Sequence, residues 1–399
     1  MGVLAEPEHV YPQHRSAWEE TTRRQVVDRF REAIYGRTPP GRVETTWRLL
    51  DEGQEAPHGA IRRQIAVTFS GPRGTSTATV LVHLPAQESG VPAYLGLNFR
   101  GNHTCTADDA VLRAGIDQPA ETGQIHYDNL REQFDVPPTR GSMANRWPLD
   151  LITRRGYAVI TMSYLQVGPD HAGIFARGLH SALTRTGPDD RPVAQWGAIG
   201  MWAWTLSRLQ DALQRGMVPE VDPAQVTLVG HSRLGKAALW AGAADPRFAA
   251  VISNNSGCMG AALSRPVGET PEILARIRPY WFARSFSTRV LAGRPLPVDQ
   301  HQLLACIAPR PLYVASASED HNADPEGEFR SWRTAAQVWQ LYDFPPPNST
   351  FPRPGGTSGH SRTPLGYHLR PGAHSVETFD WEHWLDFCDR WVRRRQPRG

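Results

Sequence analysis

The stretch VTLVGHSRLGKAALWAGA, residues 226–243, decides the fold. It begins with four apolar or β-branched residues, continues with Ser232 between Gly230 and Gly235, and ends in an apolar run with helical spacing. This order predicts a buried strand, a sharp turn and a helix, with the glycines leaving room for a bend that lifts the Ser232 hydroxyl above the sheet. A plain strand–turn–helix in which the serine caps the helix is the alternative interpretation.

Short apolar runs on both sides of this stretch extend the alternation of strand and helix. Five runs are nearly continuous in apolar residues, as in strands covered on both faces: 93–99, 157–164, 226–230, 249–255 and 311–317. Helical spacing marks 16–36, 196–215 and 380–395, and the segments 62–71 and 76–85 predict an antiparallel hairpin. We therefore predict an α/β fold: a mostly parallel central sheet with an antiparallel N-terminal edge and helices on both faces.

The whole chain, residues 1–399, is predicted to form a single domain in which residues 1–45 are a helical lead-in. Two long stretches, 101–145 and 257–300, fit no regular element and are rich in glycine, proline and polar residues. Both follow strand ends, where open α/β sheets bind ligands. We therefore expect these two stretches to be long loops that build the site.

Composition and charge exclude several classes of function. The net charge of +3 is small for 399 residues, and the basic tail 390–399 is interpreted as a solvated helix end, so no nucleic-acid partner is expected. No apolar run is long enough to span a membrane, and no signal peptide is visible, so we expect no membrane partner and a cytoplasmic protein unless a leader was removed. We also expect a monomer. The cysteines and histidines lack metal-binding spacing, and we expect neither a metal nor a cofactor.

An acid and a histidine follow the serine in the order that a serine hydrolase of this architecture requires. The run 311–317 leads into SEDHNADPEGEF (318–329), which supplies Glu319, Asp320 and Asp324. The segment GYHLRPGAHSVE (366–377) predicts a strand whose end carries His374. Because each group would lie just beyond a strand, we predict that Ser232 is a nucleophile and His374 its general base.

Segments spread over most of the chain resemble carbohydrate esterase family 15, the glucuronoyl esterases. The S-R-x-G-K signature at 232–236 is specific to that family. The other similar segments are LNFRGNHT (97–104), RGSMANRWPLDLITRRGYAVIT (140–161), WGAIGMWAW (196–204), SNNSGCMGAALSR (253–265), PYWF (279–282), IAPRPLYVASASED (307–320) and DWEHWLDF (380–387). The resemblance implies the α/β-hydrolase fold and hydrolysis of esters between (4-O-methyl)glucuronic acid on xylan and alcohols of lignin.

Two cations near the serine fit this chemistry. Attack by Ser232 makes an oxyanion, and the planar, permanently charged guanidinium of Arg233 can lie against it. A solvent-exposed residue in the first helical turn is the alternative interpretation of Arg233. The resemblance implies that Lys236 and Glu269 bind the uronic acid, with a capping role at the start of the helix TPEILARI (270–277) as the alternative for Glu269.

Two positions depart from the family pattern. Many relatives carry the acid of the triad at the position of Asn255, and an amide cannot compensate the charge of an imidazolium. Other relatives take the acid from the end of the next strand, where we predict Asp320 and keep its neighbour Glu319 as the alternative. Relatives also commonly carry, at the position of Asn322, a tryptophan that packs on the sugar.

Three functions follow as hypotheses. The first is a serine esterase that acts on a small-molecule or polysaccharide glucuronate ester. The second keeps the same triad but is an intracellular esterase or lactonase of a small-molecule ester. The third is a non-catalytic protein of this fold that binds a carbohydrate or a protein partner, and the complete set of Ser232, His374 and Asp320 argues against it.

Overall fold

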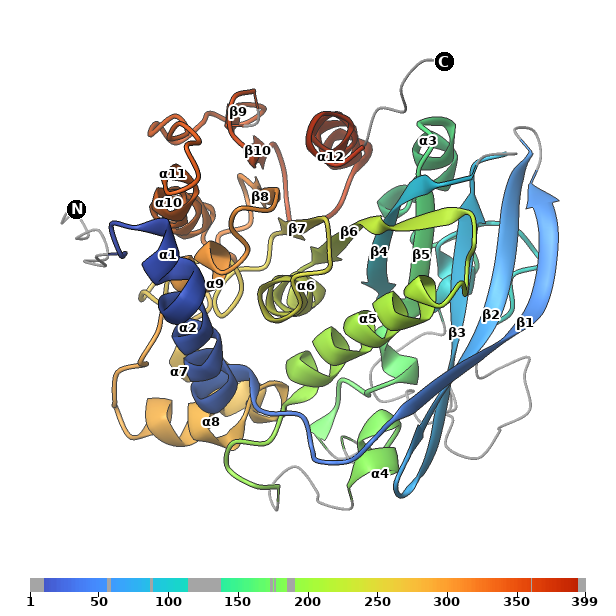
Figure 1. Ribbon diagram of the computed structural model, residues 1–399, viewed down its shortest axis with the longest axis horizontal. Coiled ribbons are helices and arrows are strands. Elements are labelled where there is room, and N and C mark those ends of the chain that lie inside the picture. The colour runs from blue at the N-terminus through green and yellow to red at the C-terminus, as the bar shows by residue number, and fades with distance from the viewer. Residues whose placement is uncertain are drawn as a thin grey trace.

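One ten-stranded sheet runs across the molecule, in the order β1-β2-β3-β5-β4-β6-β7-β8-β10-β9 (Figure 1). The computed structural model describes residues 11–55, 59–86, 89–113, 138–172, 175, 177–184, 191–359 and 361–393. The strands are β1 (Glu44–Glu55), β2 (Ala60–Gly71), β3 (Gly74–Leu84), β4 (Val91–Asn98), β5 (Ala158–Ser163), β6 (Val221–His231), β7 (Ala250–Asn254), β8 (Leu312–Ala317), β9 (Thr357–Gly359) and β10 (Leu365–Arg370).

The central strands are parallel and the edges are antiparallel. Strands β5, β4, β6, β7, β8 and β10 pair in parallel, whereas β1, β2 and β3 form an antiparallel N-terminal edge and β9 pairs antiparallel with β10. This confirms the predicted mostly parallel sheet with its antiparallel edge. The edge strands β1 and β9 were not predicted, because β1 is polar and half exposed and β9 is only three residues long.

Helices cover both faces of the sheet (Figure 1). They are α1 (Arg15–Ala17), α2 (Arg23–Phe30), α3 (Leu149–Arg154), α4 (Leu179–Leu183), α5 (Ala198–Gln214), α6 (Arg233–Ala244), α7 (Pro271–Ile277), α8 (Arg284–Leu291), α9 (Gln300–Ala305), α10 (Pro325–Ala335), α11 (Gln337–Gln340) and α12 (Thr378–Trp391). Shorter or wider helical segments are η1 (Trp18–Thr22), η2 (Arg31–Tyr35), η3 (Asn102–Thr104), η5 (Ala144–Arg146), η6 (Tyr164–Gln166) and η8 (Pro279–Trp281). The helical segments between residues 15 and 35 follow one another directly and end at Gly36, as predicted.

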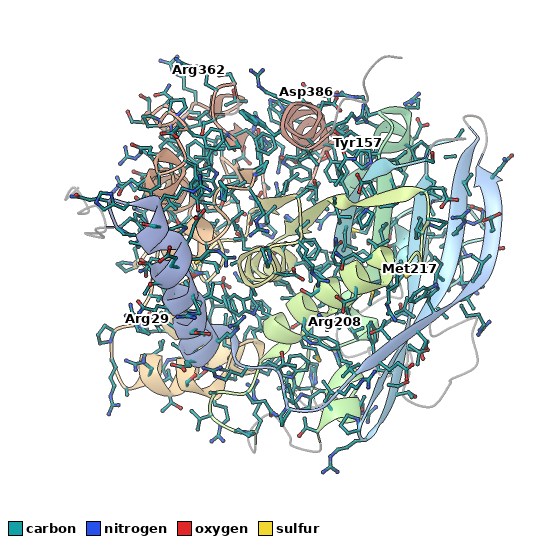
Figure 2. The ribbon with its side chains drawn as sticks, viewed as in Figure 1. Arg29, Tyr157, Arg208, Met217, Arg362 and Asp386 are labelled. Atoms are coloured by element: carbon teal, nitrogen blue, oxygen red, sulfur yellow. The ribbon has the colours of Figure 1, made fainter. Side chains whose placement is uncertain are left out.

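Two hydrophobic cores lie on opposite faces of the sheet. Along β4, Tyr94 packs in the core beneath α3 and α12, while the next residue, Leu95, packs in the larger core beneath α5 and α6. Successive side chains of a strand point to opposite faces, so both must be apolar when both faces are covered. Figure 2 shows Tyr157 on the α12 side and Met217 on the α5 side, in separate cores.

The expectation that 101–145 and 257–300 contain no regular element is wrong for the second stretch. Residues 257–300 contain η8 and the helices α7 and α8, of seven and eight residues, and end at the first residue of α9. Some of the prolines and glycines that mark this stretch as a loop stand at helix ends: Pro271 begins α7, Pro279 begins η8, and Gly293 follows α8. In the first stretch the structure describes 101–113 and 138–145, which hold η3 and the start of η5, and residues 114–137 lie outside the described part.

All ten strands, from residue 44 to residue 370, belong to one sheet, and this continuity supports the prediction of a single domain. The predicted helical lead-in at 1–45 is helical from residue 15 to residue 35, and its last two residues already belong to β1. Among the described residues, no helix is both long and apolar enough to cross a membrane. Cellular location and the monomeric state stay predictions.

Candidate active site

Ser232 stands on a strained turn between β6 and α6. Its backbone angles, φ 56° and ψ −131°, lie in a region that residues other than glycine seldom adopt. A Cβ atom on Gly230 would lie 2.2 Å from the carbonyl oxygen of Leu234, so only glycine fits there. The Ser232 side chain makes no capping hydrogen bond to α6, which argues against the interpretation of Ser232 as a helix cap. The turn instead presents the hydroxyl at the carboxyl end of the sheet.

His374 and Asp320 meet beyond the ends of two neighbouring strands, β10 and β8. Nδ1 of His374 and Oδ2 of Asp320 are 2.5 Å apart, a short hydrogen bond. The Asp320 side chain is buried (5% exposed), whereas 42% of the His374 side chain is exposed. Glu319, the alternative acid, is exposed to solvent. The structure therefore brings Asp320, and not Glu319, to the imidazole.

A second polar group holds the Asp320 carboxylate. Nδ2 of Asn255 donates to Oδ2 of Asp320 over 2.7 Å. Burial raises the pKa of Asp320, but the hydrogen bonds and charge of His374 and the hydrogen bond of Asn255 lower that pKa by more, and it lies below its usual value. Asn255, the position at which many relatives carry the acid, thus lies beside Asp320. The loop after β7 and the loop after β8 meet at the Asp320 carboxylate.

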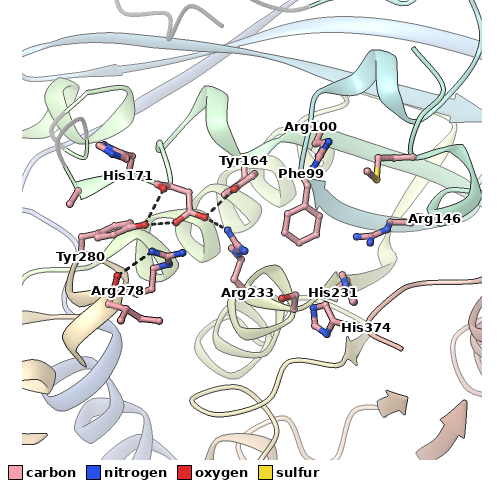
Figure 3. A pocket seen from close by; sticks show the side chains of 15 residues that line it. Phe99, Arg100, Arg146, Tyr164, His171, His231, Arg233, Arg278, Tyr280 and His374 are labelled. Atoms are coloured by element: carbon pink, nitrogen blue, oxygen red, sulfur yellow. Dashed lines mark hydrogen bonds and ion pairs between the residues drawn. The ribbon is translucent and has the colours of Figure 1, made fainter. Parts of the chain in front are cut away.

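Ser232, Arg233 and His374 line one cavity of about 610 Å³ (Figure 3). Its other walls come from the loop after β4, from the end of the first predicted site loop, from residues 164–172 and from the second predicted site loop. The lining residues outside the serine turn and His374 are Phe99, Arg100, Met143, Arg146, Tyr164, Asp170, His171, Ala172, Ile277, Arg278 and Tyr280. Both predicted site stretches therefore contribute to the walls, with Met143 from the first and Ile277, Arg278 and Tyr280 from the second.

Arg233 is held by a buried carboxylate that sequence reasoning missed. Its Nη1 donates to Oδ2 of Asp170, and that carboxylate also accepts hydrogen bonds from Tyr164 Oη (3.1 Å), Tyr280 Oη (2.9 Å) and Trp281 Nε1 (2.5 Å). Burial lowers the pKa of Arg233, but the charge of Asp170 raises that pKa by more, so the guanidinium stays charged. Its Cζ lies 5.2 Å from the centre of the Trp281 ring, within cation–π distance.

This environment argues against the alternative interpretation of Arg233 as a solvent-exposed residue of the first helical turn. The side chain is 30% exposed and points along the cavity wall, so it is not a freely solvated helix residue. Asp170 carries no sequence signal, because it lies in a loop without periodicity. Its partners Tyr280 and Trp281 stand in the segment PYWF, which the family resemblance had marked.

Lys236 and Glu269 form an ion pair, with Lys236 Nζ 3.2 Å from Glu269 Oε2. The same Nζ donates to the carbonyl oxygen of Ser256 over 2.7 Å. The Lys236 side chain is 4% exposed and that of Glu269 is 28% exposed, and neither lines the 610 Å³ cavity. The capping alternative for Glu269 is wrong, since Thr270 is the N-cap of α7 and accepts from the backbone N–H of Ile273.

The exposed Asn322 lies next to this pair. Its carbonyl oxygen accepts a hydrogen bond from the backbone N–H of Glu269 over 3.0 Å. The position that commonly holds the sugar-packing tryptophan in relatives is therefore adjacent to a predicted sugar ligand, and here it carries a small polar side chain.

Two further buried groups at or near the site, His231 and Glu328, were not predicted to take part in it. The ring of His231 packs on that of His374, with centroids 4.4 Å apart, and burial holds the pKa of His231 well below its usual value, so it is neutral. The Glu328 carboxyl accepts from the Gly257 backbone N–H (2.8 Å) and from the Ser316 hydroxyl (2.6 Å), and burial raises its pKa to about 8. Glu328 thereby supports the loop that carries Asn255. No group of three or more metal-ligating side chains was found among the described residues.

Comparison with known proteins agrees with this geometry. The family model of fungal glucuronyl esterases matches residues 153–343. Carbohydrate esterase MZ0003, from an unidentified prokaryote, is 35% identical over 384 residues, which cover 93% of this chain and 84% of the relative. A solved glucuronoyl esterase from Solibacter usitatus is 32% identical with a TM-score of 0.83, over 97% of this chain and 99% of that one.

A second solved structure, of a promiscuous CE15 esterase from a marine bacterial metagenome, is 32% identical with a TM-score of 0.81, over 97% and 98% of the two chains. These matches cover nearly the full length of both partners and include the sheet and the loops around Ser232. They confirm the predicted α/β-hydrolase fold. With a strained serine turn, an ordered His374–Asp320 pair and relatives above 30% identity over almost its whole length, this chain belongs to carbohydrate esterase family 15, the glucuronoyl esterases.

Proposed function

We propose that this protein is a serine carboxylic-ester hydrolase that cleaves esters of (4-O-methyl)-D-glucuronic acid, of the lignin–xylan type, through an acyl-enzyme on Ser232. The observation that carries the proposal is the hydrogen-bonded His374–Asp320 pair in the same cavity as the strained Ser232. The full-length similarity to a glucuronoyl esterase supports the choice of the acid part of the ester.

The reaction divides into two displacements at the ester carbonyl. The Oγ of Ser232 attacks the carbonyl carbon while Nε2 of His374 takes its proton, and the imidazolium then protonates the departing alcohol. Water attacks the acyl-enzyme in the same way and releases glucuronate. Asp320 keeps Nδ1–H of His374 in place and compensates the charge of the imidazolium, a role that fits its short hydrogen bond and lowered pKa.

The oxyanion is stabilised by donors at the start of α6. Backbone N–H groups there and in the loop after β4 form the usual pair of donors in this fold. The Arg233 guanidinium adds a charged donor. Asp170 holds its Nη1, while the side chain is 30% exposed and lines the cavity. Asp170 would fix the guanidinium without using up its donors, which suits a preorganised oxyanion site.

Lys236 and Glu269 are proposed to bind the uronic acid ring as a unit. Glu269 is the more exposed partner and would touch sugar hydroxyls. Lys236 is buried behind Glu269, and its Nζ donates to the Ser256 carbonyl oxygen. It would hold the Glu269 carboxylate in position. We assign sugar contact to Glu269 and positioning to Lys236 because the Glu269 side chain is the more exposed of the two.

The test is a comparison of kcat/KM for benzyl D-glucuronate and for a plain aryl acetate. The proposal expects a clear preference for the glucuronate ester, because Glu269 and Lys236 have no partner on an acetate. A preference for the acetate would contradict the proposal and favour an esterase of small-molecule esters.

A further inference from the structure

Arg370, the last residue of β10, is buried and holds the backbone on both sides of His374. Its Nη1 donates to the carbonyl oxygen of Pro371 over 2.7 Å. Its Nη2 donates to the carbonyl oxygens of Ala373 (2.6 Å) and Ser375 (3.2 Å). Residues 371–377 have no regular secondary structure, so the planar guanidinium supplies hydrogen bonds that a helix or strand would otherwise give this loop.

The charge of Arg370 is compensated by Asp380, in the first turn of α12. The Asp380 side chain is fully buried, and its Oδ2 lies 3.1 Å from Nε of Arg370. The same carboxylate accepts hydrogen bonds from Nε2 of His368 (2.7 Å) and from the backbone N–H of Glu377 (2.8 Å). Because removal of one partner from a buried ion pair leaves an uncompensated charge, Arg370 and Asp380 depend on each other.

Asp380 also reaches the serine turn, through Asn254. Nδ2 of Asn254 donates to Oδ1 of Asp380 over 3.4 Å, a long hydrogen bond. Oδ1 of the same amide accepts from Nδ1 of His231 over 2.5 Å, and the Asn254 carbonyl oxygen accepts from the backbone N–H of Ser232 over 2.9 Å. The His231 ring in turn packs on that of His374 (Figure 3). One buried carboxylate therefore joins the serine turn to the loop of the histidine.

His374 depends on its backbone for its position. Its side chain is 42% exposed, and the hydrogen bond between Nδ1 and Asp320 fixes one point of the ring. In the proposed mechanism Nε2 has to meet Oγ of Ser232, and the direction in which the side chain leaves the backbone decides whether it does. A misplacement of about 1 Å can cost on the order of 10²-fold in rate.

We propose that Arg370 is a positioning residue for the general base. Its hydrogen bonds hold the peptide groups before and after His374, and its ion pair with Asp380 ties this backbone to the serine turn. Arg370 does not line the cavity at Ser232, so an effect on the reaction has to pass through His374. This inference rests on the triad of the proposed function and is independent of the sugar.

The test is Arg370→Lys. Lysine keeps a positive charge beside Asp380, but one ammonium group cannot reproduce the planar fork that serves three carbonyl oxygens. The measured quantity is the second-order rate constant for labelling of Ser232 by a fluorophosphonate, which reports activation of the serine by His374 without a sugar. We expect this constant to fall by roughly 10- to 10²-fold. On benzyl D-glucuronate, kcat should fall by the same factor while KM stays within about 2-fold.

Arg310→Lys is the matched control. Arg310 precedes β8, at the end of the sheet opposite the active site, and it too donates to three backbone carbonyl oxygens, those of Gly242 (2.5 Å), Asp245 (3.1 Å) and Phe248 (3.2 Å). Both substitutions remove a guanidinium that holds backbone carbonyls, and both should lower the melting temperature. At a temperature at which both variants are folded, only Arg370→Lys should slow the labelling of Ser232.

The outcomes separate this inference from the proposed function. Labelling at the wild-type rate in folded Arg370→Lys, an equal loss in Arg310→Lys, or a raised KM with unchanged kcat would overturn the positioning role while the esterase assignment stands. If Arg370→Lys does not fold, the same comparison is made on Arg370→Gln combined with Asp380→Asn, which removes both buried charges together.

The labelling also covers a failure of the proposed substrate. Wild-type protein that is labelled but does not cleave benzyl D-glucuronate would refute the glucuronate ester as substrate, and the labelling rates alone would then confirm or overturn the role of Arg370. Wild-type protein that is not labelled at Ser232 would overturn the triad and the role of Arg370 together.

Discussion

Replacing Asp320 by asparagine removes one charge from the proposed triad and little else. The carboxylate is buried and lies 2.5 Å from Nδ1 of His374. Two unit charges about 4 Å apart interact by about 4 kcal/mol at an effective dielectric of about 20. Because 42% of the His374 side chain is exposed, solvent screens part of this attraction in the imidazolium state. We expect a loss in kcat of roughly 10²- to 10³-fold, from about 3–4 kcal/mol.

The assay is kcat and kcat/KM on benzyl D-glucuronate, with folding checked by circular dichroism. Glu319→Gln is the matched control, since it removes the neighbouring but exposed carboxylate, and it should change kcat by less than about 2-fold, as for most surface substitutions. A larger loss in Glu319→Gln than in Asp320→Asn would refute the assignment of the acid. Adding Asn255→Glu to Asp320→Asn should recover part of the activity, because the Asn255 side chain already reaches Asp320.

The remaining predictions concern the nucleophile and the groups around it. Ser232→Ala should leave the fold intact and lower kcat by roughly 10⁶-fold, as measured by product release on the same ester. Asp170→Asn should lower kcat on every ester by on the order of 10-fold, since Arg233 loses the carboxylate that positions it. An unchanged kcat would contradict a role of Asp170 in positioning Arg233. Lys236→Ala should raise KM for glucuronate esters only, and equal damage on an aryl acetate would contradict a role in sugar binding. Burial raises the pKa of Glu328 to about 8, so the native state binds a proton that the unfolded chain releases near pH 4.5, and stability should fall as pH rises between these values. In Glu328→Gln that slope of unfolding free energy against pH should disappear, and a persistent slope would show that another group causes it.

Local signals predicted the central sheet and the serine turn. The β6–Ser232–α6 unit could be predicted because its strand, its glycines and its helix follow one another directly in the sequence. Asp320 and His374 could be predicted as candidates because each follows a strand, and parallel strands end at one edge of a sheet. The sequence alone did not separate Asp320 from Glu319, which are neighbours; the structure places Asp320 against His374 and leaves Glu319 exposed to solvent, and the role of Asp320 as the acid stays a prediction.

What the sequence did not reveal depends on contacts between distant segments. Asp170 meets Arg233, Tyr280 and Trp281 only after three separate loops have folded together. The strand β1 has no apolar run and is defined by its pairing with β2. The helices α7 and α8 have only seven and eight residues, too few to show a helical period in the sequence, and the prolines and glycines near them favoured the prediction of a loop.

Trapping the acyl-enzyme tests the role of Ser232 as nucleophile most directly. Wild-type protein mixed with benzyl D-glucuronate is quenched in acid before turnover is complete, digested, and examined by mass spectrometry for a glucuronoyl group. We expect the adduct on the peptide that contains Ser232, and none in Ser232→Ala. An adduct on another residue, or glucuronate release by Ser232→Ala at the wild-type rate, would contradict this role of Ser232.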